Sequence, residues 1–335
     1  MTVRSKLLWT SLIILAIIPV KLSAQGNLGQ SGLNFLQIPA EARGAALGGG
    51  GLACASGAQA IFWNPAAMTY AEGIEAAFSH TNWFVDTRLT YAAAMMPLSA
   101  SNAIGLSATV FGTDPLEITT EAEPGGTGET YDAGDLAAGL SFARRMTDRF
   151  SFGISGKLVQ ENIWNSTTSQ VAIDIGSRYG TDFRNLVLAM AVRNIGGKLE
   201  FSGDDVDNRL AVEEARGEAS NPRLERLTPG LRLPQVFQVG IAFDALRNDH
   251  LVWQVMLDAE VPSDNTERVI LATEVEFNHL LFLRGAYREG FDVGSLNLGA
   301  GVRLQLGGQS LSLDYAVMFS EHFGALNTIG IGIGL

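Results

Sequence analysis

Residues 296–306 read LNLGAGVRLQL and alternate strictly between two kinds of side chain. Leucine, alanine and valine occupy the even positions, whereas asparagine, glycine, arginine and glutamine occupy the odd ones. Successive side chains of a β-strand point to opposite faces, so this period of two predicts a strand. One face of that strand is apolar and the other is polar, as in a strand between two different media.

The same period recurs along most of the chain, for example in 150–158, 171–178 and 310–319. Counting such runs predicts about fourteen strands, an even number that suits an antiparallel sheet closed on itself. The expected strands are 74–84, 87–97, 103–113, 133–146, 150–163, 168–180, 185–200, 234–246, 250–261, 268–278, 280–289, 294–307, 310–320 and 326–335.

The connections between these strands alternate between tight turns and longer polar loops, of which the longest are 114–132 and 201–233. Outer-membrane barrels have short periplasmic turns and longer outer loops. The alternative is a soluble β-sandwich or propeller, in which one face packs on a second sheet and the two ends show no such difference. We therefore predict an all-β protein, a closed antiparallel transmembrane β-barrel of about 14 strands with an N-terminal lumenal plug and both chain ends periplasmic.

The N-terminus resembles a secretory signal peptide. Arg4 and Lys6 precede an apolar run from Leu7 to Val20, and small residues lead up to Ala24. We expect cleavage near Ala24/Gln25 and location in the outer membrane of a Gram-negative bacterium. A transmembrane anchor is the alternative, but this run is shorter than the ~20 residues that span a bilayer.

Charge and motif content exclude several function classes. The formal net charge of -12 argues against a nucleic-acid partner, and the single cysteine and four scattered histidines give no metal-ligand spacing. No GxSxG or HExxH motif is present. We expect no enzyme activity and no cofactor.

The polar strand faces carry charges of both signs, which would face the lumen. Unpaired charges in a dry interior cost several kcal/mol each, so these side chains must be hydrated or paired. Ordinary ion pairs of the barrel wall, without a role in binding, are the alternative interpretation. The candidate lumen-facing charges are Arg178, Arg193, Glu274, Arg284 and Arg303.

The segment before the first strand is neither alternating nor charged, and small residues dominate it. Ser56 and Gln59 resemble a capping box for a short helix, which must end before Pro65 because Asn64 precedes a proline. We predict that 25–70 forms a plug inside the barrel. A surface tail is the alternative.

The plug is the middle of three expected regions of the chain: 1–24 is the signal peptide, 25–70 the plug or hatch, and 71–335 the barrel. The stretch FWNPAAM at 62–68 is the most distinctive part of the plug. Its candidate hatch residues, expected to rest against the barrel wall, are Trp63, Asn64, Pro65 and Ala66.

Six stretches of the chain are distinctive: GQSG at 29–32, ARGAALGG at 42–49, FWNPA at 62–66, FSHTNWF at 78–84, VRNIGGKL at 192–199 and LDYA at 313–316. These stretches resemble the PorV/PorQ family of outer-membrane proteins, which belongs to a FadL-like class of fourteen-stranded barrels. The resemblance implies that Asn64, Pro65 and Ala66 belong to an N-terminal hatch inside the barrel.

The same resemblance implies two possible functions. One is a part in type IX protein secretion, with secreted cargo C-terminal domains and attachment-complex proteins as partners beside outer-membrane lipid. The other is FadL-like transport of small hydrophobic molecules. For the first, the long charged loop 201–233 is the expected protein-facing surface.

Overall fold

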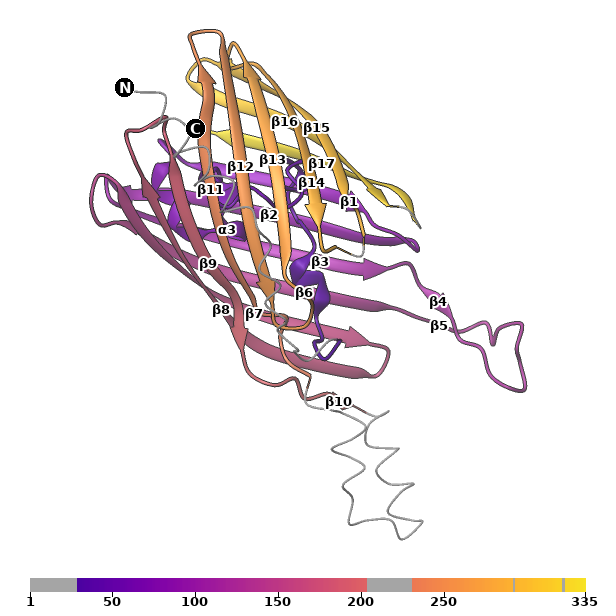
Figure 1. Ribbon diagram of the computed structural model, residues 1–335. Coiled ribbons are helices and arrows are strands. Elements are labelled where there is room, and N and C mark those ends of the chain that lie inside the picture. Colours follow the sequence, from indigo (N-terminus) through magenta and orange to yellow (C-terminus); the bar gives the residue numbers. More distant parts are fainter. Residues whose placement is uncertain (1–28, 204–230, 292, 321–322) are drawn as a thin grey trace, which may run out of the picture.

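A computed structural model describes residues 29–203, 231–291, 293–320 and 323–335 (Figure 1). The expected signal peptide, 1–24, lies outside the described residues, as does 204–230, most of the long loop on which the cargo hypothesis focuses.

Fourteen long strands form one closed antiparallel sheet (Figure 1). Each pairs with its neighbours in the chain, and the first closes the barrel by pairing with the last over Glu75–Asn82. The predicted fold class is confirmed, with strand bounds within a few residues of those expected. The strands are β1 Glu75–Asn82, β2 Thr87–Ser99, β3 Asn102–Thr113, β6 Ala133–Arg145, β7 Phe150–Ile163, β8 Ser166–Gly180, β9 Val187–Gly196, β11 Val236–Arg247, β12 Leu251–Pro262, β13 Arg268–Phe277, β14 Leu281–Glu289, β15 Leu296–Leu306, β16 Gln309–Ser320 and β17 Gly324–Gly334.

The two faces of the wall differ as the alternation predicts. On β15 and β16, Leu298 and Leu313 are 45% and 53% exposed on the outside. On the inside, Arg284 of β14 is only 5% exposed. Because large apolar side chains dominate the outward positions of the strands, the outer surface suits contact with lipid.

The two ends of the barrel also differ. One end carries short turns, such as those between β13 and β14 and between β15 and β16. The other end carries the longer connections, including 114–132, in which β4 (Leu116–Glu117) and β5 (Thr130–Tyr131) form a hairpin projecting beyond the wall (Figure 1). A short strand there, β10 (Ser202–Gly203), pairs with β8. By the loop-length rule, this second end is the outer one.

Within the described part of the chain, the helices lie in the N-terminal segment, and the contacts below place them inside the barrel. They are short: η1 Asn34–Gln37, α2 Ala42–Ala46, η2 Gly57–Gln59, α3 Ala60–Trp63 and η3 Pro65–Tyr70. Among the described residues, no helix has the length and apolar character needed to cross a membrane.

The facing of the strands is testable with one substitution made on both sides of β16. Leu313→Arg introduces a cation on the lipid side near the middle of the strand and should cost roughly 2–4 kcal/mol of barrel stability. Ser310→Arg introduces the same side chain on the inner side, where it lines an open polar pocket, and should assemble almost normally. Heat-modifiable gel migration measures assembly. Equal losses of assembled barrel in the two variants would contradict the assignment of Leu313 to the lipid side and Ser310 to the inner side.

Candidate functional site in the barrel lumen

The plug, residues 29–70, enters the lumen from the outer end. The backbone N–H of Gly29 donates to the carbonyl of Asp264 in the outer β12–β13 loop. Phe35 stacks on Phe111 near the outer end of β3. The described start of the plug therefore lies at the outer end. The N-terminal end of the chain lies outside the described residues, so the expectation that both chain ends are periplasmic stays a prediction. The barrel itself still begins and ends at the inner end, where β1 starts and β17 stops.

The hatch residues fit into the wall of β7 and β8. The Asn64 side chain accepts from the N–H of Ala66 and donates to the carbonyl of Ser177. Glycines face this contact: a Cβ at Gly153 would lie 2.3 Å from the backbone nitrogen of Ala66, and one at Gly176 would lie 2.1 Å from Asn64 Oδ1. The wall therefore admits the hatch backbone only because these two positions lack side chains.

Asn64 also separates the α-helix α3 from the 3-10 helix η3. Helix α3 ends at Trp63, and Asn64 is extended with φ -153°, as expected of a residue before proline. Its side chain caps η3. The expected capping box at Ser56 is wrong, because its side chain makes no cap hydrogen bond. Sequence inspection missed Asn64 as a cap because η3 was not expected.

Glu41 joins the first and second halves of the plug. It is buried, and its Oε1 accepts from the N–H of Gly44, which caps α2, and from Nε1 of Trp63 at 2.9 Å. Burial raises the pKa of the Glu41 carboxyl. Nothing in the local sequence identifies this contact, because its two partners are 22 residues apart.

An ion cluster of four side chains joins α2 to the wall. Arg43 of α2 donates through Nε and a terminal nitrogen to both carboxylate oxygens of Glu274, each at 2.9 Å. Glu274 also accepts from Arg284, and Arg284 donates to Asp314 at 2.6 Å. Both wall acids and Arg284 are buried. Two cations and two carboxylates balance, which satisfies the requirement that buried charges be paired.

A second polar cluster lies on the β7–β9 wall. The β8–β9 pairing shifts register between Ile173 and Ile175, and Asn194 there has φ +60°. The bulge brings the Asn194 N–H to Asp174, whose carboxylate also pairs with Lys157 at 2.8 Å. A bulge of this kind turns two successive residues of one strand inward.

The structure places the five predicted lumen charges on the inner side of the wall. Glu274 and Arg284 belong to the ion cluster. The guanidinium of Arg193, next to the bulge, lies 5.1 Å from the Trp63 ring centroid, and that of Arg178 lies 3.8 Å from the Tyr70 ring centroid. Arg303 differs: it lies beside Phe282 and lines an open pocket.

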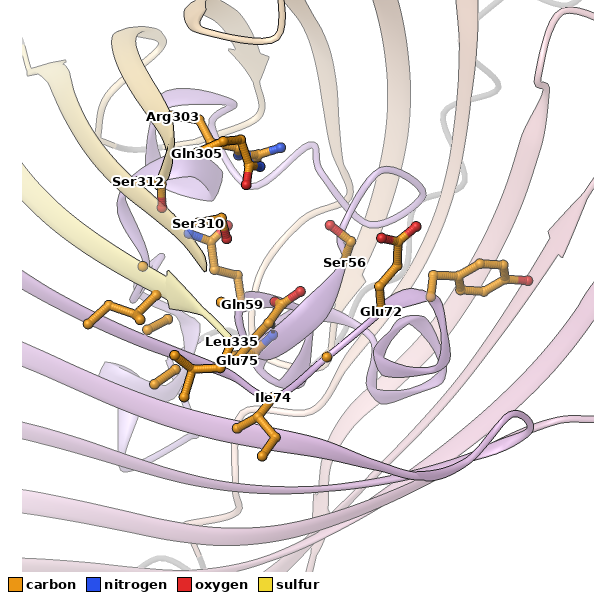
Figure 2. Close-up of a pocket in the computed structure, with 18 of the residues that line it drawn as sticks. Ser56, Gln59, Glu72, Ile74, Glu75, Arg303, Gln305, Ser310, Ser312 and Leu335 are labelled. Carbon is orange, nitrogen blue, oxygen red and sulfur yellow. Dashed lines mark hydrogen bonds between the residues drawn. The ribbon is translucent and has the colours of Figure 1, made fainter. Parts of the chain in front are cut away.

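That open pocket, here called the inner pocket, lies at the inner end between the plug and β1, β15, β16 and β17. Its volume is about 360 Å³. Figure 2 shows Arg303 and Gln305 of β15 across the pocket from Ser56 and Glu72. Serines and glycines of β16 and β17 line its wall, including Ser310 and Gly332. Its lining is mainly polar and leaves space beside the plug.

A larger pocket of about 730 Å³, here called the outer pocket, lies at the outer end above the plug. Its size falls within the usual range of small-molecule sites. Sequence analysis missed it because its walls come from the plug, from outer turns and from separate strands. Its lining is mainly apolar and includes Phe35, Ile38, Trp83, Phe84, Phe111 and Phe291. Five charged residues also line it: Asp135, Glu161, Asp264, Arg268 and Arg288.

The single cysteine lies within the plug. Cys54 Sγ is 3.6 Å from Met256 Sδ of β12, and the Cys54 carbonyl accepts from Arg43 at 3.1 Å. Burial raises the pKa of the Cys54 thiol to about 11. The thiol is therefore protonated at neutral pH and is a poor nucleophile while the plug stays in place.

No protein-family model matches this sequence, and no curated protein sequence does either. Solved structures do match in fold. A Pseudomonas aeruginosa FadL homologue has a TM-score of 0.52 and 14% identity, covering 88% of this chain and 96% of that one. The monoaromatic hydrocarbon channel CymD has a TM-score of 0.55 and 10% identity, with the same coverages of 88% and 96%. The Ralstonia pickettii toluene transporter TbuX has a TM-score of 0.51 and 11% identity, covering 83% and 92%.

The closed barrel, its apolar outer face and these neighbours define an outer-membrane β-barrel. Its architecture is FadL-like, with fourteen strands and an N-terminal segment in the lumen. At these identities the similarity concerns the fold. The narrower PorV/PorQ resemblance rests on the sequence motifs alone.

Proposed function

We propose that this protein transports small hydrophobic molecules across the outer membrane and captures them in the outer pocket. The observation that carries the proposal is the mainly apolar lining of that pocket, which lies at the outer end of the barrel. The apolar area that a ligand buries there stabilises it by roughly 25 cal/mol per Å². The names of the structural neighbours, a toluene transporter and a monoaromatic hydrocarbon channel, support this choice of ligand class.

The geometry of the pocket suits a compact apolar ligand. The Phe35 and Phe111 rings stack with centroids 6.4 Å apart, and Trp83 and Phe84 lie 5.0 Å apart on the β1–β2 turn. Aromatic faces of this kind offer large apolar contacts with little loss of rotamer freedom. Because Phe35 belongs to the plug and Phe111 to the wall, a ligand in this pocket would contact both.

A pair of tryptophan variants tests this proposal. Trp83→Ser removes an indole that lines the outer pocket and should weaken ligand capture by about 1–2 kcal/mol of lost apolar contact. The probe is N-phenyl-1-naphthylamine, and the measurement is the concentration dependence of its uptake by cells carrying the protein. We expect a several-fold higher half-saturating concentration for Trp83→Ser.

The matched control is Trp164→Ser. Trp164 is an exposed tryptophan of the outer β7–β8 turn and does not line the outer pocket. Its variant should take up the probe like the parent protein. If the parent gives no uptake above cells lacking the protein, or if the two variants are impaired equally, the proposal is wrong.

A second candidate function is the type IX secretion role that the PorV/PorQ resemblance implies. The observation that favours it is the β4–β5 hairpin, which projects from the outer end (Figure 1). The connection 114–132 contains no lysine or arginine, so it offers an acidic surface to a protein partner. Its acidic residues are Asp114, Glu117, Glu121, Glu123, Glu129 and Asp132.

Neutralising this hairpin tests the secretion role. The variant carrying Glu117→Gln, Glu121→Gln, Glu123→Gln and Glu129→Gln keeps the shape of the side chains and removes four charges. We expect the parent, but not this variant, to co-purify with secreted cargo C-terminal domains. Absence of co-purification with the parent excludes the role for that cargo, and equal recovery with the variant excludes the hairpin as the contact.

A further inference from the structure

The inner face of β16 connects the two pockets. From the outer end inward, its side chains on this face are Met318, Ala316, Asp314, Ser312 and Ser310. Met318 lines the outer pocket, whereas Ser312 and Ser310 line the inner pocket. Ala316 and Asp314 lie between them. One strand therefore runs from the apolar capture pocket to a polar space at the inner end.

Helix α2 is the part of the plug that lies between the two pockets on this wall. Ala45 and Ala46 form an apolar cluster with Ala316. A Cβ at Gly299 of β15 would lie 2.3 Å from Cβ of Ala46, and one at Gly330 of β17 would lie 2.8 Å from Cβ of Ala42. The contact is therefore close but made of alanines and glycines. Such small side chains give fewer dispersion contacts than interdigitating large ones.

The ion pair of Arg43 with Glu274 is the strongest polar contact between α2 and the wall. Glu274 has a second partner besides Arg43, because it also pairs with Arg284, which in turn pairs with Asp314. If α2 moves away, Glu274 and Asp314 both keep Arg284 as a partner, so neither carboxylate is left without a cation, and the wall then carries one negative charge in excess.

The opposite side of the plug is attached differently. Pro65 and Ala66 fit the glycines of β7 and β8, and Asn64 donates to the wall backbone. Large buried side chains, Ile61 and Met68, pack against β3 at Gly105. Moving α3 or η3 would break these contacts and leave cavities, and cavities in a close-packed interior cost free energy. Moving α2 breaks the Arg43–Glu274 pair and the Glu41–Trp63 hydrogen bond, but its contacts with the wall at Ala316 involve only small side chains. The two sides of the plug therefore differ in the kind of contact that must break.

We propose that the passage for ligand runs along β14–β17 and β1, and that α2 is its gate. In this proposal the inner pocket is the exit site, while α3 and η3 stay fixed on the opposite wall. The proposal rests on the proposed transport function. It specifies which five residues of the plug must move, Ala42–Ala46.

The first test measures ion conductance in planar bilayers containing potassium chloride and therefore needs no ligand. Arg43→Ala removes the plug side of the ion pair and leaves Glu274 paired with Arg284, so we expect a higher conductance than that of the parent. Arg178→Ala is the matched control, because it removes an arginine that contacts Tyr70 on the fixed side. It should conduct like the parent. The proposal would be overturned if Arg43→Ala had the same conductance as the parent protein, or if the conductance rose equally in both variants.

The second test fixes α2 to the wall with a disulfide. The substitutions Ala46→Cys and Ala316→Cys, made with Cys54→Ser and Arg43→Ala, place two cysteines in the alanine cluster. Oxidation should abolish the conductance gained by Arg43→Ala, and a reductant should restore it. Conductance that persists after complete cross-linking would show that the passage lies elsewhere. Heat-modifiable migration establishes that each variant is assembled before it is measured.

Uptake of N-phenyl-1-naphthylamine separates the gate from the transport function. In the cross-linked protein with Arg43 retained, we expect loss of probe uptake on oxidation and its return on reduction. If the conductance tests succeed but the parent takes up no probe, the gate stands and the proposed ligand class fails. If the parent takes up probe and cross-linking leaves uptake unchanged, the transport function stands and the gate fails.

Discussion

Closure of the sheet by the pairing of β1 with β17 is the constraint on which the rest of the structure depends. In lipid, every strand N–H and C=O group needs a partner, and only a sheet without edges provides one for each. Residues Glu75–Asn82 pair with β17 along their whole length. Once the sheet is closed, it has an inside of fixed width, and the polar strand faces are directed into that space.

The contents of the lumen follow from this closure. Most charged side chains of the inner wall are buried, so they need partners there. The wall supplies some of them within itself, as Arg284 does for Glu274 and Asp314. The plug supplies others, with Arg43 as a second cation for Glu274 and the Trp63 ring beside Arg193. The plug is thus a structural complement of the inner wall as well as an obstacle in the lumen.

The sequence was most informative for the wall strands, where lipid on one face and the lumen on the other require different side chains. The alternation in 296–306 predicts β15 because lipid and lumen select different side chains on its two faces, and the same reasoning located all fourteen wall strands. It was least informative where distant segments meet. The β8–β9 bulge depends on a positive φ at Asn194, and the cap of α2 depends on Glu41 rather than on a conventional capping residue. The outer pocket combines residues from Phe35 to Phe291, and no local pattern identifies such a set.

The central claim is that residues 29–70 fill the lumen of the folded barrel, and the single cysteine tests it most directly. Maleimide labelling of Cys54 is measured in intact outer membranes and again after denaturation. The plugged barrel predicts slow labelling at neutral pH, since the thiol has a pKa of about 11. On unfolding, labelling should become fast as the pKa falls toward the ordinary ~8.5.

A variant with Cys54→Ser and Glu123→Cys, on the exposed hairpin, provides the control that labels fast in both states. Fast labelling of Cys54 in folded protein in the membrane would contradict the account.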